Sequence, residues 1–110
     1  MTAAAFRKLA LALPGVEEQP HFERTSFRVG KKIVATMTSD GKEAMTRVAP
    51  RDKLYRLLRE QPEVFFSHKG WTERLGAVGI RLAKADAALI SELLRECHQK
   101  VSSKSAKSRS

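Results

Sequence analysis

The sequence predicts an α+β domain in which α-helices pack on one face of an antiparallel β-sheet. Two observations lead to this prediction. Three short segments between residues 25 and 48 alternate apolar and polar side chains and are separated by glycine-containing turns, as in a meander of half-buried strands. Segments with apolar residues at helical spacing precede and follow this run. The expected order of elements is α-β-β-β-α-β-α.

The first expected helix starts at Thr2, a residue type that caps helix N-termini, and stops at Pro14-Gly15. Residues 18–22 then form a short extended segment. The helix carries one apolar stripe at spacings of three and four residues, and this stripe is expected to be buried. Its members are Phe6, Leu9, Ala10 and Leu13.

The three strands of the meander are expected at residues 25–29, 32–38 and 43–48. Gly30-Lys31 connects the first two strands. Glycine at the first position of a two-residue turn suits a type II′ hairpin, whose twist matches that of the strands. The Ser-Asp-Gly-Lys segment at residues 39–42 is the second turn signal. Strands that follow one another so directly are expected to pair antiparallel.

Pro50 suits the first turn of a second helix, which Gln61-Pro62 ends. Residues 64–66 are a short apolar run, expected to be a buried strand or the lead-in to one. Residues 67–76 are expected to form a loop that carries Trp71. The last strand follows this loop, at residues 77–82.

Asp86 is expected to cap a third helix, which has the clearest helical pattern in the chain. Its apolar residues fall at i, i+3, i+4, i+7 and i+11, namely Ile90, Leu93, Leu94, Cys97 and Val101. From Ser102 onward the chain is rich in serine and basic residues, and it has too little apolar surface to offset the entropy of ordering. We therefore expect one domain over residues 1–101 and a disordered basic tail over residues 102–110.

The charge balance favours anionic partners. Lys and Arg number 21 against 12 Asp and Glu, a formal charge of +9, and only three of these cations lie in the tail. An excess of this size favours nucleic acid or an anionic membrane surface as a partner. Cys97 is the only cysteine, which excludes an internal disulfide and a multi-thiolate metal site. No stretch approaches the roughly 20 apolar residues of a membrane span, so we expect a cytoplasmic protein without a membrane partner.

Several motifs are spread along the chain rather than gathered in one place. They are Leu13-Pro14-Gly15-Val16-Glu17, His21-Phe22, the run from Ser26 to Lys32, and Pro62 to Phe66 before the last strand. Together they resemble the MmcQ/YjbR family of small bacterial proteins, from about Phe6 to Val101. The resemblance implies the YjbR-like double-wing fold, which groups with the CyaY-like (frataxin-like) superfamily. It also implies a DNA-binding role without known chemistry.

A basic surface is expected on the sheet face that the helices leave open, because side chains alternate between the two faces of a strand. Ser26 and Thr36 are expected there too, on the solvated side. The expected nucleic-acid-binding residues, including the turn tips and Trp71, are Arg24, Arg28, Lys31, Lys32, Lys42, Arg47, Lys69, Trp71 and Arg81. The alternative is that alternating charge marks any wet sheet face, and that lysines at turns and edges suppress aggregation.

Two further features have competing interpretations. Trp71 could stack on an unpaired base, as aromatic residues do in single-strand binders, but such residues more often pack over the edge of the core. The cations of the second helix, which include Arg51 and Lys53, resemble a basic stripe. Acidic residues at i,i+4 spacing to Arg56 instead indicate an ordinary solvated face.

No motif of enzyme chemistry is present in the sequence. There is no glycine-rich phosphate loop or nucleophile elbow, and the histidines lack metal-ligand spacing. We therefore expect a non-catalytic protein without metal or cofactor. The expected function is DNA binding of low sequence specificity, through the basic sheet face and the hairpin wings. The alternative is a protein-interaction module that uses the open sheet face or an exposed strand edge.

Overall fold

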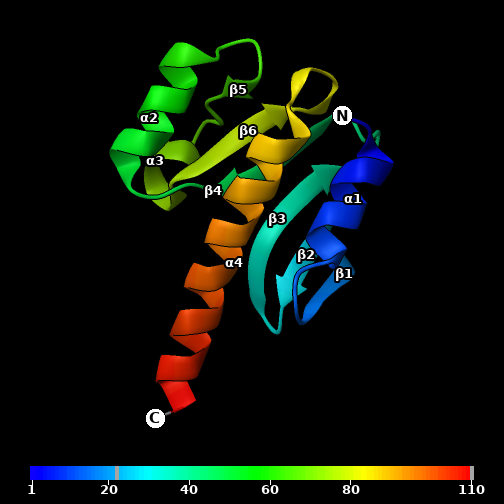
Figure 1. Ribbon diagram of the computed structural model, residues 1–110, viewed down its shortest axis with the longest axis vertical. Coiled ribbons are helices and arrows are strands. Elements are labelled where there is room, and N and C mark those ends of the chain that lie inside the picture. The colour runs from blue at the N-terminus through cyan, green and yellow to red at the C-terminus, as the bar shows by residue number, and fades with distance from the viewer. Residues whose placement is uncertain (22, 110) are drawn as a thin grey trace.

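Figure 1 shows the computed structural model of the protein, which describes residues 1–21 and 23–109, and the side chains of residues 1–20 and 23–102. Six strands form one antiparallel sheet in the order β1-β2-β3-β4-β6-β5. The elements are α1 (Ala3–Leu11), β1 (Val16–His21), β2 (Arg24–Val29), β3 (Lys32–Thr38), β4 (Glu43–Arg47), α2 (Arg51–Glu60), β5 (Phe65–Phe66), α3 (Thr72–Leu75), β6 (Ala77–Arg81), a 3₁₀ turn (Leu82–Lys84) and α4 (Ala87–Arg109).

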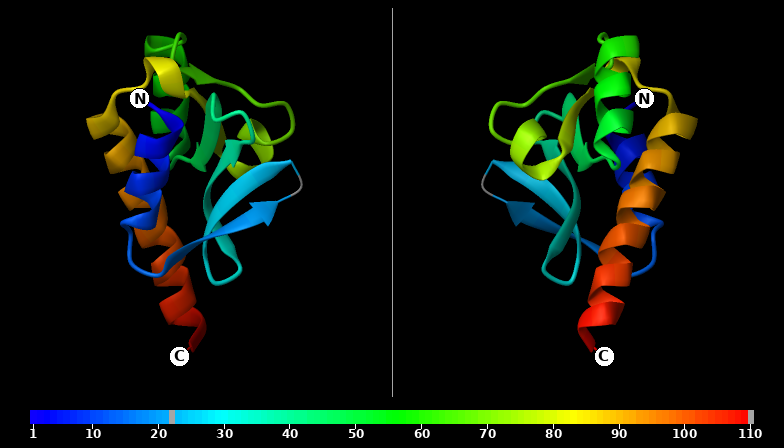
Figure 2. Two further views of the ribbon diagram at one scale, coloured as in Figure 1. Left: turned by 90° about the vertical axis from the view of Figure 1, so that its right-hand side faces the viewer. Right: turned by 90° about the vertical axis from the view of Figure 1, so that its left-hand side faces the viewer.

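Helices α1 and α4 cover one face of the sheet, and the short helix α3 lies on the other side (Figure 2). Helix α2 packs beside β5 at one end of the molecule. The predicted α+β fold with an antiparallel sheet is confirmed. The structure adds a turn of helix, α3, within the segment that the sequence predicts as a loop, and it orders β1 as a full strand of the sheet.

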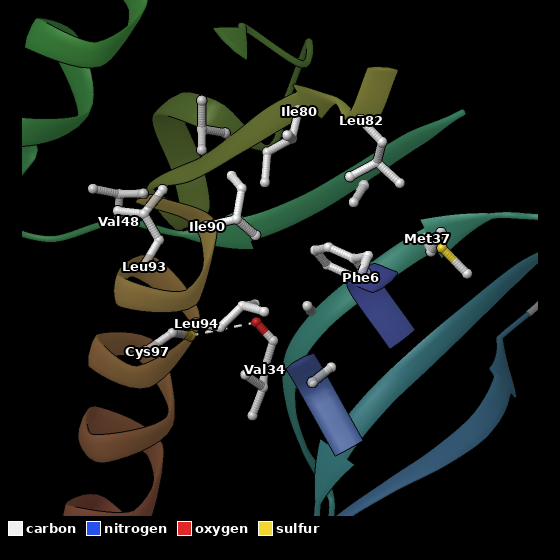
Figure 3. Close-up of a cluster of buried hydrophobic side chains, with 14 of the residues drawn as sticks. Phe6, Val34, Met37, Val48, Ile80, Leu82, Ile90, Leu93, Leu94 and Cys97 are labelled. Carbon is white, nitrogen blue, oxygen red and sulfur yellow. Dashed lines mark hydrogen bonds between the residues drawn. The ribbon is translucent and has the colours of Figure 1, made fainter. Parts of the chain in front are cut away.

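The core lies between the sheet and helices α1 and α4 (Figure 3). Phe6 of α1 and Phe27 of β2 are fully buried and meet edge to face, with ring centres 5.9 Å apart. The spacing predicted for the third helix places Ile90, Leu93 and Leu94 against the sheet, and all three are buried. These side chains fix the position of α4 over β3.

Local signals in the sequence set the element boundaries. The Thr2 hydroxyl accepts a hydrogen bond from the Ala5 N–H (3.1 Å), and the Asp86 carboxylate accepts one from the Leu89 N–H (3.1 Å), so both predicted caps are confirmed. Gly30 has φ +61° at the first position of its turn, in the region that glycine adopts without strain. Gly30 therefore has the positive φ that the predicted two-residue turn requires at its first position.

Helix α4 continues past the boundary predicted at Val101. Its backbone is helical as far as Arg109, where the composition predicts a disordered tail. The C-terminal end of this helix extends beyond the sheet (Figure 1). The mobility of residues 102–110 in solution stays a prediction.

The Cys97 thiol faces the sheet and is 6% exposed. Its Sγ donates to the carbonyl oxygen of Val34 at 3.4 Å, the dashed line in Figure 3. Cys97→Ala should lower the free energy of unfolding by about 1 kcal/mol, because it removes buried atoms and this hydrogen bond. Urea unfolding measures the change. Rapid labelling of the native protein by a thiol reagent would contradict the buried position.

The β3–β4 turn contains the one carboxyl group in the described part of the chain with a clear pKa shift. The Thr38 hydroxyl donates to Asp40 Oδ1 at 2.7 Å and, more weakly, the Lys42 N–H donates to the same oxygen at 3.0 Å. These bonds hold the pKa of Asp40 below its ordinary value of 3.8.

A lowered folded-state pKa means that the Asp40 contribution to stability is fully present above pH 3.8 and is lost as the pH falls through the folded-state pKa. Asp40→Asn should therefore differ most in stability from the parent near neutral pH, and the difference should shrink below about pH 4. Urea unfolding at several pH values measures it. A difference independent of pH would show that the charge of Asp40 plays no part.

Candidate nucleic-acid interface

A cleft of about 980 Å³ opens beside the tip of the β2–β3 hairpin. Its other walls are α4, the segment from the end of β4 to the start of α2, and the end of α3. Cationic side chains from five different parts of the chain line it, and all of them are exposed to solvent. These residues are Lys31, Lys32, Arg47, Arg51, Arg74 and Lys100.

Each cation is placed by the local structure that precedes it. The turn at Gly30 projects Lys31 and Lys32 from the hairpin. Arg47 is the last residue of β4, and Arg51 is the first residue of α2, so the short connection between these elements keeps both at the same wall. The hairpin lysines and the Arg47–Arg51 pair are each close in sequence, and the fold of the sheet and its helices brings these two groups, Arg74 and Lys100 around one cleft.

Opposing negative charge is scarce in the cleft. Glu96 of α4 is the one carboxylate among the described lining residues. Its Oε1 lies 2.7 Å from Nζ of Lys53, which is itself partly buried. The Lys53–Glu96 pair therefore neutralises that carboxylate within the protein. Six cations remain around the cleft, and their mutual repulsion falls when an anion enters.

Apolar residues are also among those that line the cleft. Val48 and Cys97 are buried there, and Ile33, Leu75 and Val101 contribute further apolar surface. Walls of low dielectric constant concentrate the field of the surrounding cations and raise the local concentration of anions. The arrangement suits phosphate groups that approach from solvent.

The structure separates the predicted site residues into groups. Lys31, Lys32 and Arg47 lie together in the cleft. Lys42 lies in the β3–β4 turn, at the opposite end of β3 from the hairpin tip. Arg81, on β6, places its guanidinium 4.7 Å from the centre of the Phe66 ring and donates to the Pro62 carbonyl at 3.1 Å. These last two are not part of the cleft.

Four predicted residues lie on or near the face of the sheet that carries α3. Arg28 donates from Nε to the Ser26 hydroxyl at 2.8 Å. The Arg24 guanidinium lies 5.3 Å from the centre of the Trp71 ring, which also stacks on His68 with 4.3 Å between ring centres. Lys69 is exposed in the loop before α3. Trp71 is thus partly buried, and it contacts His68 and Arg24 on this face of the sheet.

The predicted solvated sheet face is partly covered. Ser26 is fully buried and Thr36 is 7% exposed, because α3 and the loop before it lie over this side of the sheet. Helix α3 has only four residues, too few to produce a periodic apolar pattern from which a cover could be predicted. The cations expected on one basic sheet face are therefore divided: some line the cleft, and others lie near Trp71 or at the far end of the sheet.

Three cleft cations were not among the predicted site residues. The sequence pattern of the second helix predicts an ordinary solvated face for Arg51, and Arg74 and Lys100 are isolated cations in unrelated segments. No local motif marks them, because they meet only through the packing of α3 and α4 on the rest of the fold. The i,i+4 acidic partners expected at Arg56 form no ion pair in the described structure; the partner that α2 uses is Glu96, on another helix.

The described residues contain no group of three His, Cys, Asp or Glu side chains placed to hold a metal ion. None of the helices in that part of the chain is long and apolar enough to cross a bilayer.

Comparisons with known proteins agree with this architecture. A family model described as YjbR matches residues 11–100. The crystal structure of Deinococcus radiodurans protein DR2400, which has a DUF419 domain, superposes with a TM-score of 0.78 at 22% sequence identity. The match covers 94% of this chain and 80% of that one. No curated protein matches the sequence. At such an identity the structural likeness concerns the fold alone.

Proposed function

Since the chain belongs to the YjbR family and gathers cations around one cleft, we propose that it binds DNA with little sequence preference through that cleft. The observation that carries the proposal is the gathering of six cations among the described residues that line the cleft, where the one lining carboxylate is paired with Lys53. Phosphate neutralisation by Lys and Arg supplies most of the affinity of such binding. The protein acts without catalysis in this proposal.

Low sequence preference follows from where the cations lie. They sit on a turn, on strand and helix ends and on the side of α4, and such positions suit contacts to phosphates. Reading of bases in duplex DNA requires side chains presented together into a groove, usually from one helix. Among the described residues that line the cleft, no single element presents such a row of polar side chains.

The alternative function is that of a protein-interaction module, and the open sheet face and free strand edge that it requires are smaller in the structure than the sequence predicts. The sheet face away from α1 and α4 is partly covered by α3 and Trp71. The outer strand β1 contains Pro20, which has no N–H to offer a partner strand, and its Glu18 is paired with Arg7 of α1 at 3.0 Å. The salt dependence of the affinity distinguishes the two functions. Affinity for DNA falls steeply as salt is added, whereas the affinity of an apolar protein interface does not.

The protein should bind duplex DNA weakly and lose affinity steeply with added salt. Each phosphate neutralised contributes about −0.9 to the slope of log affinity against log salt, so the full cleft gives a slope of at most about −5. Fluorescence anisotropy with duplexes of two unrelated sequences, at two salt concentrations, measures slope and preference. Absence of binding at low salt would refute the proposal.

A pair of double variants tests whether the cleft is the site. Lys31→Ala with Lys32→Ala removes two cations from the cleft and should reduce both the affinity and the salt slope. The matched control, Lys42→Ala with Lys84→Ala, removes two exposed lysines at the other end of the sheet. It should leave both quantities near those of the parent. Equal losses in the two variants would mean that net charge alone, without a defined site, attracts the DNA.

The cleft should matter more than the C-terminal residues. Deletion of residues 102–110 removes three positive charges, whereas the hairpin variant removes two. The hairpin lysines are held by a tight turn and meet phosphates at little cost in ordering. The deletion should therefore weaken binding less than the hairpin variant in the same anisotropy assay. Loss of binding on deletion, with parent-like binding by the hairpin variant, would assign the affinity to the tail.

A further inference from the structure

A second, smaller pocket of about 220 Å³ lies on the face of the sheet that carries α3. Strands β3, β4 and β6 form one wall, with Thr36, Met45 and Ala77, and the segment of α3 forms the other, with Trp71 and Leu75. The wall is mostly apolar. Sites for drug-sized ligands enclose about 300–1,000 Å³, so this pocket has room for a single ring system.

The hydroxyl of Thr36 is the unexplained group in this wall. The residue is 7% exposed, and its Oγ1 has no hydrogen-bond partner, the one such buried side-chain atom in the described part of the chain. Its neighbours are satisfied. The Ser26 hydroxyl, directly across on β2, donates to the Gln19 carbonyl at 2.9 Å, and the Thr46 hydroxyl donates to the Val34 carbonyl at 2.9 Å. Buried polar groups normally have hydrogen-bond partners, so we expect the Thr36 hydroxyl to hydrogen-bond to a group from outside the protein.

Arg47 joins this pocket to the basic cleft, because its side chain lines both. A ligand that reaches from one to the other therefore presents an anionic group to the cations and a flat apolar group to the pocket. A ring carbonyl on that group can accept a hydrogen bond from the Thr36 hydroxyl. A thymine, cytosine or guanine nucleotide has this combination of phosphate, ring and carbonyl, and adenine offers ring nitrogens as acceptors instead.

We propose that the pocket takes one unpaired nucleobase, whose phosphate lies at Arg47 in the cleft. This base pocket rests on the proposed DNA binding and deepens that proposal, because it makes single-stranded DNA the tighter-binding ligand. The base enters between the sheet wall and Trp71 and hydrogen-bonds to Thr36. Protein–base contacts of this kind tolerate many sequences, since every base offers a flat ring.

The test compares oligo(dT) with an abasic oligodeoxynucleotide of the same length, which has the same phosphates and no bases. Trp71 is the only tryptophan, so its fluorescence reports on the pocket. Oligo(dT) should change this fluorescence and bind more tightly than the abasic strand; free thymidine monophosphate should give the same change at higher concentration.

Equal affinity for the two strands, with no change of Trp71 fluorescence, would overturn the base pocket and leave phosphate binding in the cleft intact. Failure of both strands to bind would instead refute DNA binding itself.

The variant Thr36→Val removes the hydroxyl and keeps the shape of the side chain. Stability should be unchanged or higher, because the hydroxyl has no partner in the protein. Affinity for oligo(dT) should fall about fivefold, the loss expected for one hydrogen bond, while affinity for the abasic strand stays the same. The matched control is Thr46→Val, which removes a satisfied hydroxyl and should lower stability without changing the ratio of the two affinities. The same pattern in Thr36→Val would assign Thr36 a structural role and contradict the proposal.

Discussion

Helix α4 can rest on the sheet only because apolar side chains at spacings of three and four residues turn one of its faces toward β3. Leu93, Leu94 and Cys97 are buried in that contact, and the Cys97 thiol donates a hydrogen bond to a backbone carbonyl of β3 (Figure 3). The position of α4 in turn determines where the cleft lies. One wall of the cleft is the side of α4 that carries Glu96 and Lys100, and another wall is the β2–β3 hairpin. Packing of an apolar helix face therefore decides where the charges of the protein meet.

The cleft concentrates positive charge that the fold itself does not need. Lys53 neutralises Glu96, and no other carboxylate among the described lining residues offsets the cations. Like charges near one another lower the stability of the folded protein, and in this protein such repulsion is concentrated at the cleft. An arrangement of this kind is more typical of an anion-binding site than of a surface that serves only solubility.

The sequence allows prediction of features that depend on neighbouring residues. The caps at Thr2 and Asp86, the turn at Gly30 and the buried stripe of α4 all follow from spacing and residue type. The cleft could not be predicted, because its cations are distant in the chain and meet only after packing. The burial of Thr36 could not be predicted because α3, which covers it, is a single helical turn and is too short to show a periodic apolar pattern. This turn is held in part by a hydrogen bond of 2.7 Å from the His68 N–H to the Thr72 hydroxyl.

The central claim is that DNA phosphates bind in the cleft between the hairpin tip and α4. Amide chemical shifts from NMR, recorded while a short DNA duplex is added at low salt, test it most directly. The account predicts that the shifts change together for residues 31–33, 47–51, 74–76 and 96–101, with little change around Lys42 and Lys84 at the other end of the sheet. Changes confined to residues 102–110, or spread evenly over all exposed lysines, would contradict it.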